Sequence, residues 1–147
     1  MEKPLLEKLI KKTENHPYHK FIGLRVMEER KGSCRIKFSP SGNTRNLTGV
    51  VHGGIYYTVL DVAAFVASAT VIPDDRLTVT SDINISVLAA VSEGELIVEA
   101  RVLKTGKRNC IIDSRAFDSN GNLVAIARVT KSIIPFPQMI KLLEAAG

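Results

Sequence analysis

The stretch between Arg45 and Asp74 constrains this chain most, because Asp61 is its only formally charged side chain. Within it, Gly53–Thr70 is apolar nearly all round, a pattern typical of a helix buried in protein. The apolar run Ile55–Ile72 is barely long enough to span a bilayer, and Asp61 and several hydroxyl side chains interrupt it, so no membrane span is expected. The rest of the chain must therefore pack around this one central helix and bury it.

The segments that remain mostly alternate apolar and polar residues, which is the period of a half-buried strand. The Asn-Gly pair at 120–121 indicates a tight hairpin turn. The predicted strands are Leu24–Arg30, Ser33–Phe38, Thr78–Leu88, Leu96–Lys104, Asn109–Asp118 and Leu123–Ile134. Since short turns join consecutive strands, the sheet should be mostly antiparallel. The fold class predicted is α+β, with an antiparallel sheet wrapped around one long central helix.

Both ends of the chain extend beyond this unit. Pro4–Lys12 has the pattern of an amphipathic helix, and the Pro17 that follows argues against a regular helix around it. Pro137–Gly147 is compatible with a short terminal helix. With no linker or repeat, the chain is most simply one domain, 1–147, in which residues 1–20 form an N-terminal helix and loop and residues 135–147 a C-terminal extension of unknown role.

Charge and cysteine content limit the function classes. The net charge is +5, but the basic residues are scattered without interleaved aromatics, which argues against nucleic acid and suits a phosphorylated small molecule equally well. Cys34 and Cys110 form no visible disulfide framework, and the charged N-terminus lacks a signal-peptide core, so a reduced cytoplasmic setting is expected. His16 and His19 resemble half a metal site, but no further ligands have recognisable spacing, and no metal is expected.

Asp61 is the first candidate for chemistry, because desolvating a carboxylate is costly without a partner or a task. The structural alternative is a hydrogen bond from a neighbouring hydroxyl such as Tyr57 or Thr58. Upstream, Gly53-Gly54 stands where the helix should begin, and a helix start offers free N–H groups and the positive end of the helix dipole. One short segment thus supplies an acid/base and an anion-stabilising backbone.

The pattern Asn46-Leu-Thr-Gly-Val-Val-His52-Gly53-Gly54, followed by Leu60-Asp61, resembles the signature of hotdog-fold acyl-CoA thioesterases of the PaaI/THEM2-like family. The resemblance runs from about Phe21 to Ile134 in order and spacing. It continues through Val79–Asn84, Glu93–Leu96, Val102–Lys107 and Asn122–Ala125.

This resemblance implies hydrolysis of acyl-CoA thioesters to a carboxylic acid and free CoA, without a metal or redox cofactor. It implies that Asp61 acts as general base or nucleophile and that the Gly53 N–H donates to the oxyanion. Asn46 would orient substrate or water, and Thr80 would hold the attacking water from the polar side of its strand, beside Asp82. As structural alternatives, Asn46 is an ordinary turn residue and Thr80 an ordinary sheet threonine.

The substrate-binding residues implied are of two kinds. His52 and Gly54 would shape the turn beside the thioester, His52 in a structural more than a catalytic role. Lys104, Lys107 and Arg108 match a place where the family contacts CoA, whose phosphates suit basic side chains. The acyl group, whether aryl, hydroxyaryl or fatty, is not readable from the sequence.

The resemblance also implies partners. A homodimer would be the minimal unit, with Asn46 and Gly53 of one chain facing Asp61 and Thr80 of the other, and dimers would pair into a homotetramer of undetermined arrangement. Neither nucleic acid nor membrane is expected to bind. The alternative function is a non-catalytic acyl-CoA-binding hotdog module, which fold alone cannot separate from an enzyme.

Overall fold

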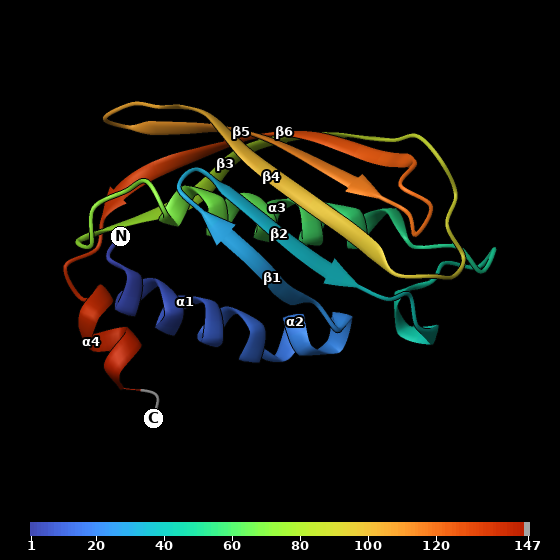
Figure 1. Cartoon of the computed structure of the whole chain (residues 1–147), viewed down its shortest axis with the longest axis horizontal. Coiled ribbons are helices and arrows are strands. Elements are labelled where there is room, and N and C mark those ends of the chain that lie inside the picture. The colour runs from blue at the N-terminus through green and yellow to red at the C-terminus, as the bar shows by residue number, and fades with distance from the viewer. Residues whose placement is uncertain (146–147) are drawn as a thin grey trace.

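The computed structural model describes residues 1–145 and contains a curved antiparallel sheet that arches over one long helix, α3 (Gly53–Ala69) (Figure 1). The strands are β1 (Arg25–Arg30), β2 (Ser33–Phe38), β3 (Arg76–Val87), β4 (Leu96–Thr105), β5 (Asn109–Phe117) and β6 (Leu123–Pro135). The other helices are α1 (Lys3–Asn15), α2 (Pro17–Ile22), the 3-10 turn η1 (Gly42–Thr44) and α4 (Met139–Glu144).

The six strands lie in the order β1-β2-β4-β5-β6-β3, and each neighbouring pair is antiparallel. The predicted hairpin is confirmed, since β5 pairs with β6 across a turn in which Gly121 has a φ of 81°. β3 lies at the edge, so its 12 residues pair on one side with β6 and offer the other side to a further strand.

The predicted buried helix is confirmed. Eleven of the 17 residues of α3 are buried, and small side chains such as Ala63 and Ala64 let it lie close to the sheet. Its hydrophobic contacts with β2, β4 and β6 form the main core, in which Ile36, Leu96 and Val129 are inaccessible to solvent. Apolar burial of this kind is the dominant stabilising contribution to such a fold.

The two ends of the chain pack together on the side of α3 that faces away from most of the sheet (Figure 1). Their second hydrophobic cluster consists of Leu6, Leu9, Ala69, Met139 and Leu143. Phe65 of α3 is half-buried against this cluster. α4 confirms the expected terminal helix, although residues 146–147 of the predicted segment lie outside the described part. No helix among residues 1–145 is long and apolar enough to cross a membrane.

The expectation that Pro17 would prevent a helix is wrong. Pro17 is the first residue of α2, a position that needs no N–H and favours the fixed φ of proline. The His16 side chain caps this helix by accepting a hydrogen bond from the Tyr18 N–H, and Gly23, at φ 81°, ends it.

Candidate active site

Asp61 lies on α3 with its side chain about one-third exposed (32%). Its Oδ1 accepts a hydrogen bond from Thr80 Oγ1 at 2.7 Å and another from Lys131 Nζ at 2.9 Å. Lys131 Nζ also donates to Thr80 Oγ1 at 2.7 Å. Three side chains from α3, β3 and β6 therefore form a closed triangle around one carboxylate oxygen.

The structural alternative for Asp61, a hydrogen bond from the hydroxyl of Tyr57 or Thr58, is wrong about the donor. The Thr58 hydroxyl donates to the Gly54 carbonyl and pairs with the Tyr18 hydroxyl at 3.0 Å. A hydroxyl does contact Asp61, but it comes from Thr80, 19 residues along the chain. The carboxylate thus has an ionic partner and a hydroxyl partner, and both come from the sheet.

Lys131 was not among the residues expected in this site. It follows Ala127 and Val129 on the inward-facing positions of β6, and its side chain is only 2% exposed. Its ammonium lies 5.7 Å from the centre of the Phe65 ring, a cation–π distance. A lysine on the apolar face of a predicted strand is the sequence signal that would have revealed it, because a buried ammonium requires a partner.

Burial lowers the pKa of the Lys131 ammonium below its ordinary value, and the charge and hydrogen bond of Asp61 oppose this effect. The ion pair with Asp61 therefore stabilises the protonated form of Lys131 at a position where burial favours the neutral amine.

Thr80 reaches the triangle because of a β-bulge. The register pairs Thr80 with Lys131 and Asp82 with Thr130, leaving Ser81 as an extra residue. Since side chains opposite each other share a face of the sheet, Thr80 points inward with Lys131. The prediction that Thr80 shares the polar side with Asp82 is therefore wrong, because strict alternation does not hold across a bulge.

The start of α3 has an unused backbone donor. His52 is the N-cap, and its Nδ1 accepts a hydrogen bond from the Gly54 N–H at 2.9 Å. The Gly53 N–H has no acceptor within residues 1–145. His52 thus caps the start of α3, and the Gly53 N–H at the same helix start is left without a partner among these residues. A Cβ added to Gly53 would meet nothing within 4 Å, which leaves this approach open.

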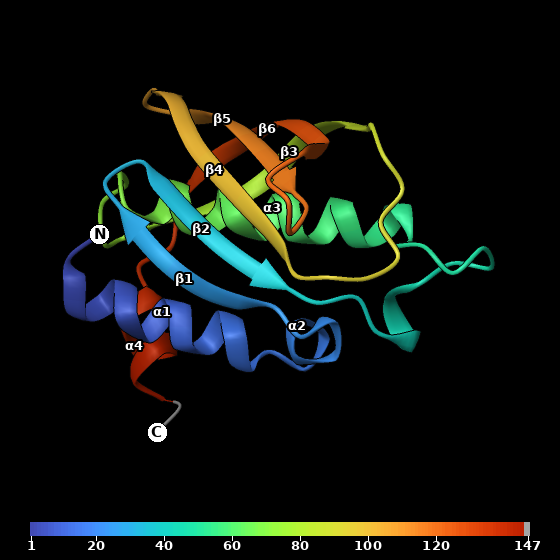
Figure 2. The same ribbon diagram turned by 45° about the vertical axis from the view of Figure 1, so that its right-hand side comes forward.

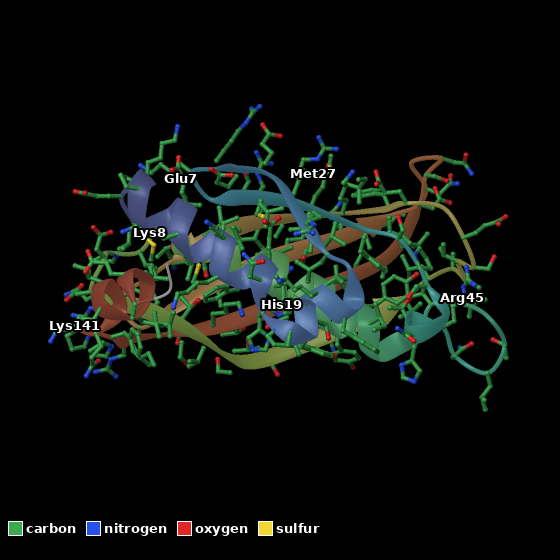
Figure 3. All side chains as sticks on the ribbon, turned by 90° about the horizontal axis from the view of Figure 1, so that it is seen from below. Glu7, Lys8, His19, Met27, Arg45 and Lys141 are labelled. Atoms are coloured by element: carbon green, nitrogen blue, oxygen red, sulfur yellow. The ribbon has the colours of Figure 1, made fainter. Side chains whose placement is uncertain are left out.

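Asn46 holds its own loop together. Its Oδ1 accepts hydrogen bonds from the Thr48 N–H at 2.9 Å, the Thr48 hydroxyl at 2.8 Å and the Val50 N–H at 3.3 Å. Asn46 therefore stabilises its own turn, which is the structural alternative considered for it. All of these hydrogen bonds use Oδ1, so the side-chain NH2 group is available to donate to another group. Figure 2 shows this loop at one end of the molecule, and in Figure 3 the neighbouring Arg45 lies at the end opposite Lys141 of α4.

Lys104, Lys107 and Arg108 are exposed around the turn between β4 and β5. All three line a shallow hollow of about 440 Å³ together with Asn109 and Ile111. Arg45, beside the Asn46 loop, donates its Nε to the Ser92 carbonyl.

One chain does not bring the predicted catalytic residues to one point. Asp61 and Thr80 are in contact, but Gly53 lies eight residues before Asp61 on the same helix, a rise of about 12 Å. Reacting groups have to lie about 3–3.5 Å from the atom they act on. Within one chain, therefore, the free N–H and the carboxylate cannot act on the same atom.

The described residues contain no cluster of three or more side chains suited to a metal ion. Both cysteines are free and buried. Burial, with a smaller contribution from Glu29, raises the pKa of the Cys34 thiol to about 12, and burial also raises that of Cys110. Neither thiol is suited to act as a nucleophile.

A family model described as the thioesterase superfamily matches residues 48–125, which include Gly53, Asp61 and Thr80 but not Lys131. The chain is 35% identical over 109 residues to a protein of Saccharolobus solfataricus named "Putative esterase", covering 73% of this chain and 71% of that one. It is 23% identical over 112 residues to the 1,4-dihydroxy-2-naphthoyl-CoA hydrolase of Listeria monocytogenes, covering 76% of this chain and 91% of that one.

Solved structures agree on the architecture. A mutant thioesterase of Pseudomonas aeruginosa superposes with a TM-score of 0.84 at 20% identity, covering 92% of this chain and 97% of that one. At that identity the likeness concerns the fold alone, and it confirms the expected sheet wrapped around a central helix.

Proposed function

Because this chain belongs to the thioesterase superfamily, whose members share the hotdog fold, we propose that it hydrolyses acyl-CoA thioesters to a carboxylic acid and free CoA. The observation that carries this proposal is the state of Asp61. Both hydrogen bonds that its side chain accepts within residues 1–145 end on Oδ1, while Oδ2 remains free and the side chain is partly exposed. The similarity to a CoA hydrolase supports CoA as the thiol.

The proposed chemistry uses two groups. As general base, Asp61 takes a proton from water through Oδ2 while the water oxygen attacks the thioester carbon. The carbonyl oxygen gains negative charge, and the Gly53 N–H at the positive end of α3 stabilises it. The intermediate then collapses, the C–S bond breaks, and the leaving sulfur takes the proton from Asp61.

A nucleophilic route uses the same oxygen. Oδ2 would attack the carbonyl carbon, expel the CoA thiolate and form a mixed anhydride, which water then hydrolyses. Both routes require a free Oδ2 and an oxyanion donor, so both are compatible with the site.

The distance between Gly53 and Asp61 supports a site shared by two subunits. The two groups cannot meet at one carbon within a chain, whereas a second copy can bring its Gly53 and Asn46 to the Asp61 and Thr80 of the first. The open edge of β3, which carries Thr80, is a surface on which a second copy can pair. A homodimer is therefore the proposed working unit, and the homotetramer stays a prediction.

The CoA part and the acyl part of the substrate have different candidate binding residues. Lys104, Lys107 and Arg108 are proposed to bind the CoA phosphates, because they are exposed and gather around one hollow. For the acyl group, the exposed aromatic rings of Phe21 and Tyr57 are candidate contacts, whereas Tyr56 is buried in the core.

The test is thiol release from a panel of acyl-CoAs, from acetyl to palmitoyl and including benzoyl, phenylacetyl and 1,4-dihydroxy-2-naphthoyl. Asp61→Asn is compared with wild type, because the amide keeps the size of the side chain and an acceptor for Lys131. Asp82→Asn is the matched control, since it makes the same change at an exposed carboxylate on the other face of β3.

We expect wild type and Asp82→Asn to hydrolyse at least one substrate, and Asp61→Asn to lose about 100-fold or more in kcat. If no protein releases thiol, yet acyl-CoAs raise the melting temperature, the chain is an acyl-CoA-binding module. Full activity in Asp61→Asn would remove Asp61 from the chemistry.

A further inference from the structure

Lys131 lies outside residues 48–125, the range that the thioesterase superfamily model matches. We infer that Lys131 is a positioning residue, which anchors Asp61 through Oδ1 and thereby presents Oδ2 to the substrate. This inference rests on the proposed function and adds to it a residue of β6, 70 positions along the chain from Asp61.

The direction of each hydrogen bond in the triangle follows from the groups present. A lysine ammonium only donates, so Thr80 Oγ1 accepts from Lys131 Nζ at 2.7 Å. The single hydroxyl proton of Thr80 is then donated to Asp61 Oδ1 at 2.7 Å. Oδ1 receives two donors and Oδ2 none, so the two carboxylate oxygens have different tasks.

This arrangement also limits what Thr80 does to water. Its only proton is committed to Asp61, so a water molecule beside it can donate to Thr80 Oγ1 but cannot accept from it. Such a water keeps its second proton for Oδ2 and its lone pairs for the thioester carbon. Thr80 therefore orients the water by accepting a hydrogen bond from it. Lys131 maintains this orientation, because its own hydrogen bond to Thr80 Oγ1 directs the Thr80 proton to Asp61.

Burial makes the anchor rigid. The Lys131 side chain is 2% exposed, and the Phe65 ring lies below its ammonium. The titratable groups that face it are Asp61 from α3 and the Cys110 thiol, which is opposite it on β5. β3 contributes the Thr80 hydroxyl. With Cys110 buried as a thiol, Asp61 is the anionic partner among these groups, and its charge stabilises the protonated form of Lys131.

The first arm of the test is kinetic. Lys131→Met keeps the length of the side chain without its charge, Lys131→Arg keeps the charge, and Arg128→Met removes a charge from an exposed position of the same strand. We expect Lys131→Met to lower kcat by about 10- to 100-fold with KM for acyl-CoA within about twofold, because a misplaced base slows the reaction more than it weakens binding. Arg128→Met should match wild type. Wild-type kcat in a folded Lys131→Met would overturn the inference.

The second arm is a pH profile. Because burial lowers the pKa of Lys131, wild-type kcat should fall on the alkaline side at a pH below that at which an exposed lysine loses its proton. In Lys131→Arg this decline should disappear, since a guanidinium keeps its charge throughout. A decline that is identical in wild type and Lys131→Arg would overturn the inference, and this arm decides the matter if Lys131→Met does not fold.

The third arm does not need activity. The titration of the Lys131 side chain is followed by NMR in wild type and in Asp61→Asn, where the lysine loses the carboxylate that raises its pKa, so its titration should move to lower pH. An unchanged titration would overturn the inference. If the titration moves but wild type hydrolyses no acyl-CoA, the anchoring of Asp61 stands and the proposed function fails.

Discussion

At the scale of single residues, the site depends on a charge pair of unequal exposure. Lys131 is almost completely buried, whereas Asp61 is about one-third exposed. Removing the carboxylate therefore harms the protein mainly through the lysine it leaves behind, since an unpaired buried charge costs more than an unpaired exposed one.

Asp61→Ala should lower the free energy of unfolding at pH 7 by about 1–3 kcal/mol, less than for a fully buried pair because Asp61 is partly solvated. Asp61→Asn should cost less, since its amide oxygen still accepts from Lys131. The folded-state pKa of Lys131 is lowered, so stability rises with pH as this lysine loses its proton, and in Asp61→Ala that rise begins at lower pH.

Denaturant unfolding at pH 7 and pH 10 measures this difference. The deficit of Asp61→Ala should be smaller at pH 10. A deficit that grows with pH would mean that the buried ammonium is not its cause.

The two glycines at the start of α3 should respond differently to alanine. In Gly53→Ala the new methyl group meets nothing within 4 Å, so the melting temperature should not fall, whereas activity should fall about tenfold or more because the methyl stands beside the proposed oxyanion donor. In Gly54→Ala the new Cβ would lie 3.1 Å from His52 Nδ1, so both stability and activity should fall. Thermal melts and kcat/KM check both variants, and a fully active Gly53→Ala would exclude the Gly53 N–H as the donor.

At the scale of elements, α3 is both the centre of the core and the scaffold of the site. Its first turn presents Gly53, its middle presents Asp61, and Phe65 one turn later connects it to the cluster of α1 and α4. The helix start is fixed by the His52 side chain, and so is the direction of the free N–H.

His52→Ala should reduce the free energy of unfolding by about 0.5–2 kcal/mol, the usual cost of losing an N-cap side chain. His52→Asn should recover most of it, because asparagine also accepts from the N–H two residues on. Chemical denaturation checks the expected order, in which wild type is the most stable, His52→Asn is intermediate and His52→Ala is the least stable. An Asn variant no better than Ala would show that the imidazole stabilises the loop by another contact.

The packing of the two terminal helices can be tested on neighbouring residues of α4. Met139 is fully buried, whereas Ile140 is about half exposed. Met139→Ala should cost about 2–4 kcal/mol and Ile140→Ala under about 1 kcal/mol. Equal losses in denaturant unfolding would mean that α4 does not dock on α1 in solution.

At the scale of the whole molecule, the proposed site requires two chains. Gly53→Ala and Asp61→Asn each impair both sites of a symmetric homodimer, but a mixed dimer has one site with neither change. After unfolding and refolding as a 1:1 mixture, half the dimers are mixed, so activity should recover to about a quarter of wild type. Activity of the mixture no higher than the mean of the two variants would contradict a site shared between subunits.

The sequence by itself determined the features that depend on neighbouring residues. Helix α3 begins at Gly53 and β2 spans Ser33–Phe38 as predicted, because periodicity and turn residues act locally. The isolation of Asp61 in an apolar run likewise marked it as a residue with a special environment. A spaced pattern of such residues carried the resemblance to the thioesterase family, and the family match over residues 48–125 confirms it.

Tertiary structure alone decided what depends on contacts between distant segments. One extra residue, Ser81, reverses the alternation of β3 and turns Thr80 towards the helix, and no count of apolar positions shows where a strand bulges. The sequence places Lys131 on the apolar face of a strand, but only the fold shows that its partners are Thr80 of β3 and Asp61 of α3. The physical reason is the same in both cases: a polar side chain is stable inside a protein only when a specific partner reaches it, and the fold determines which partners come within reach.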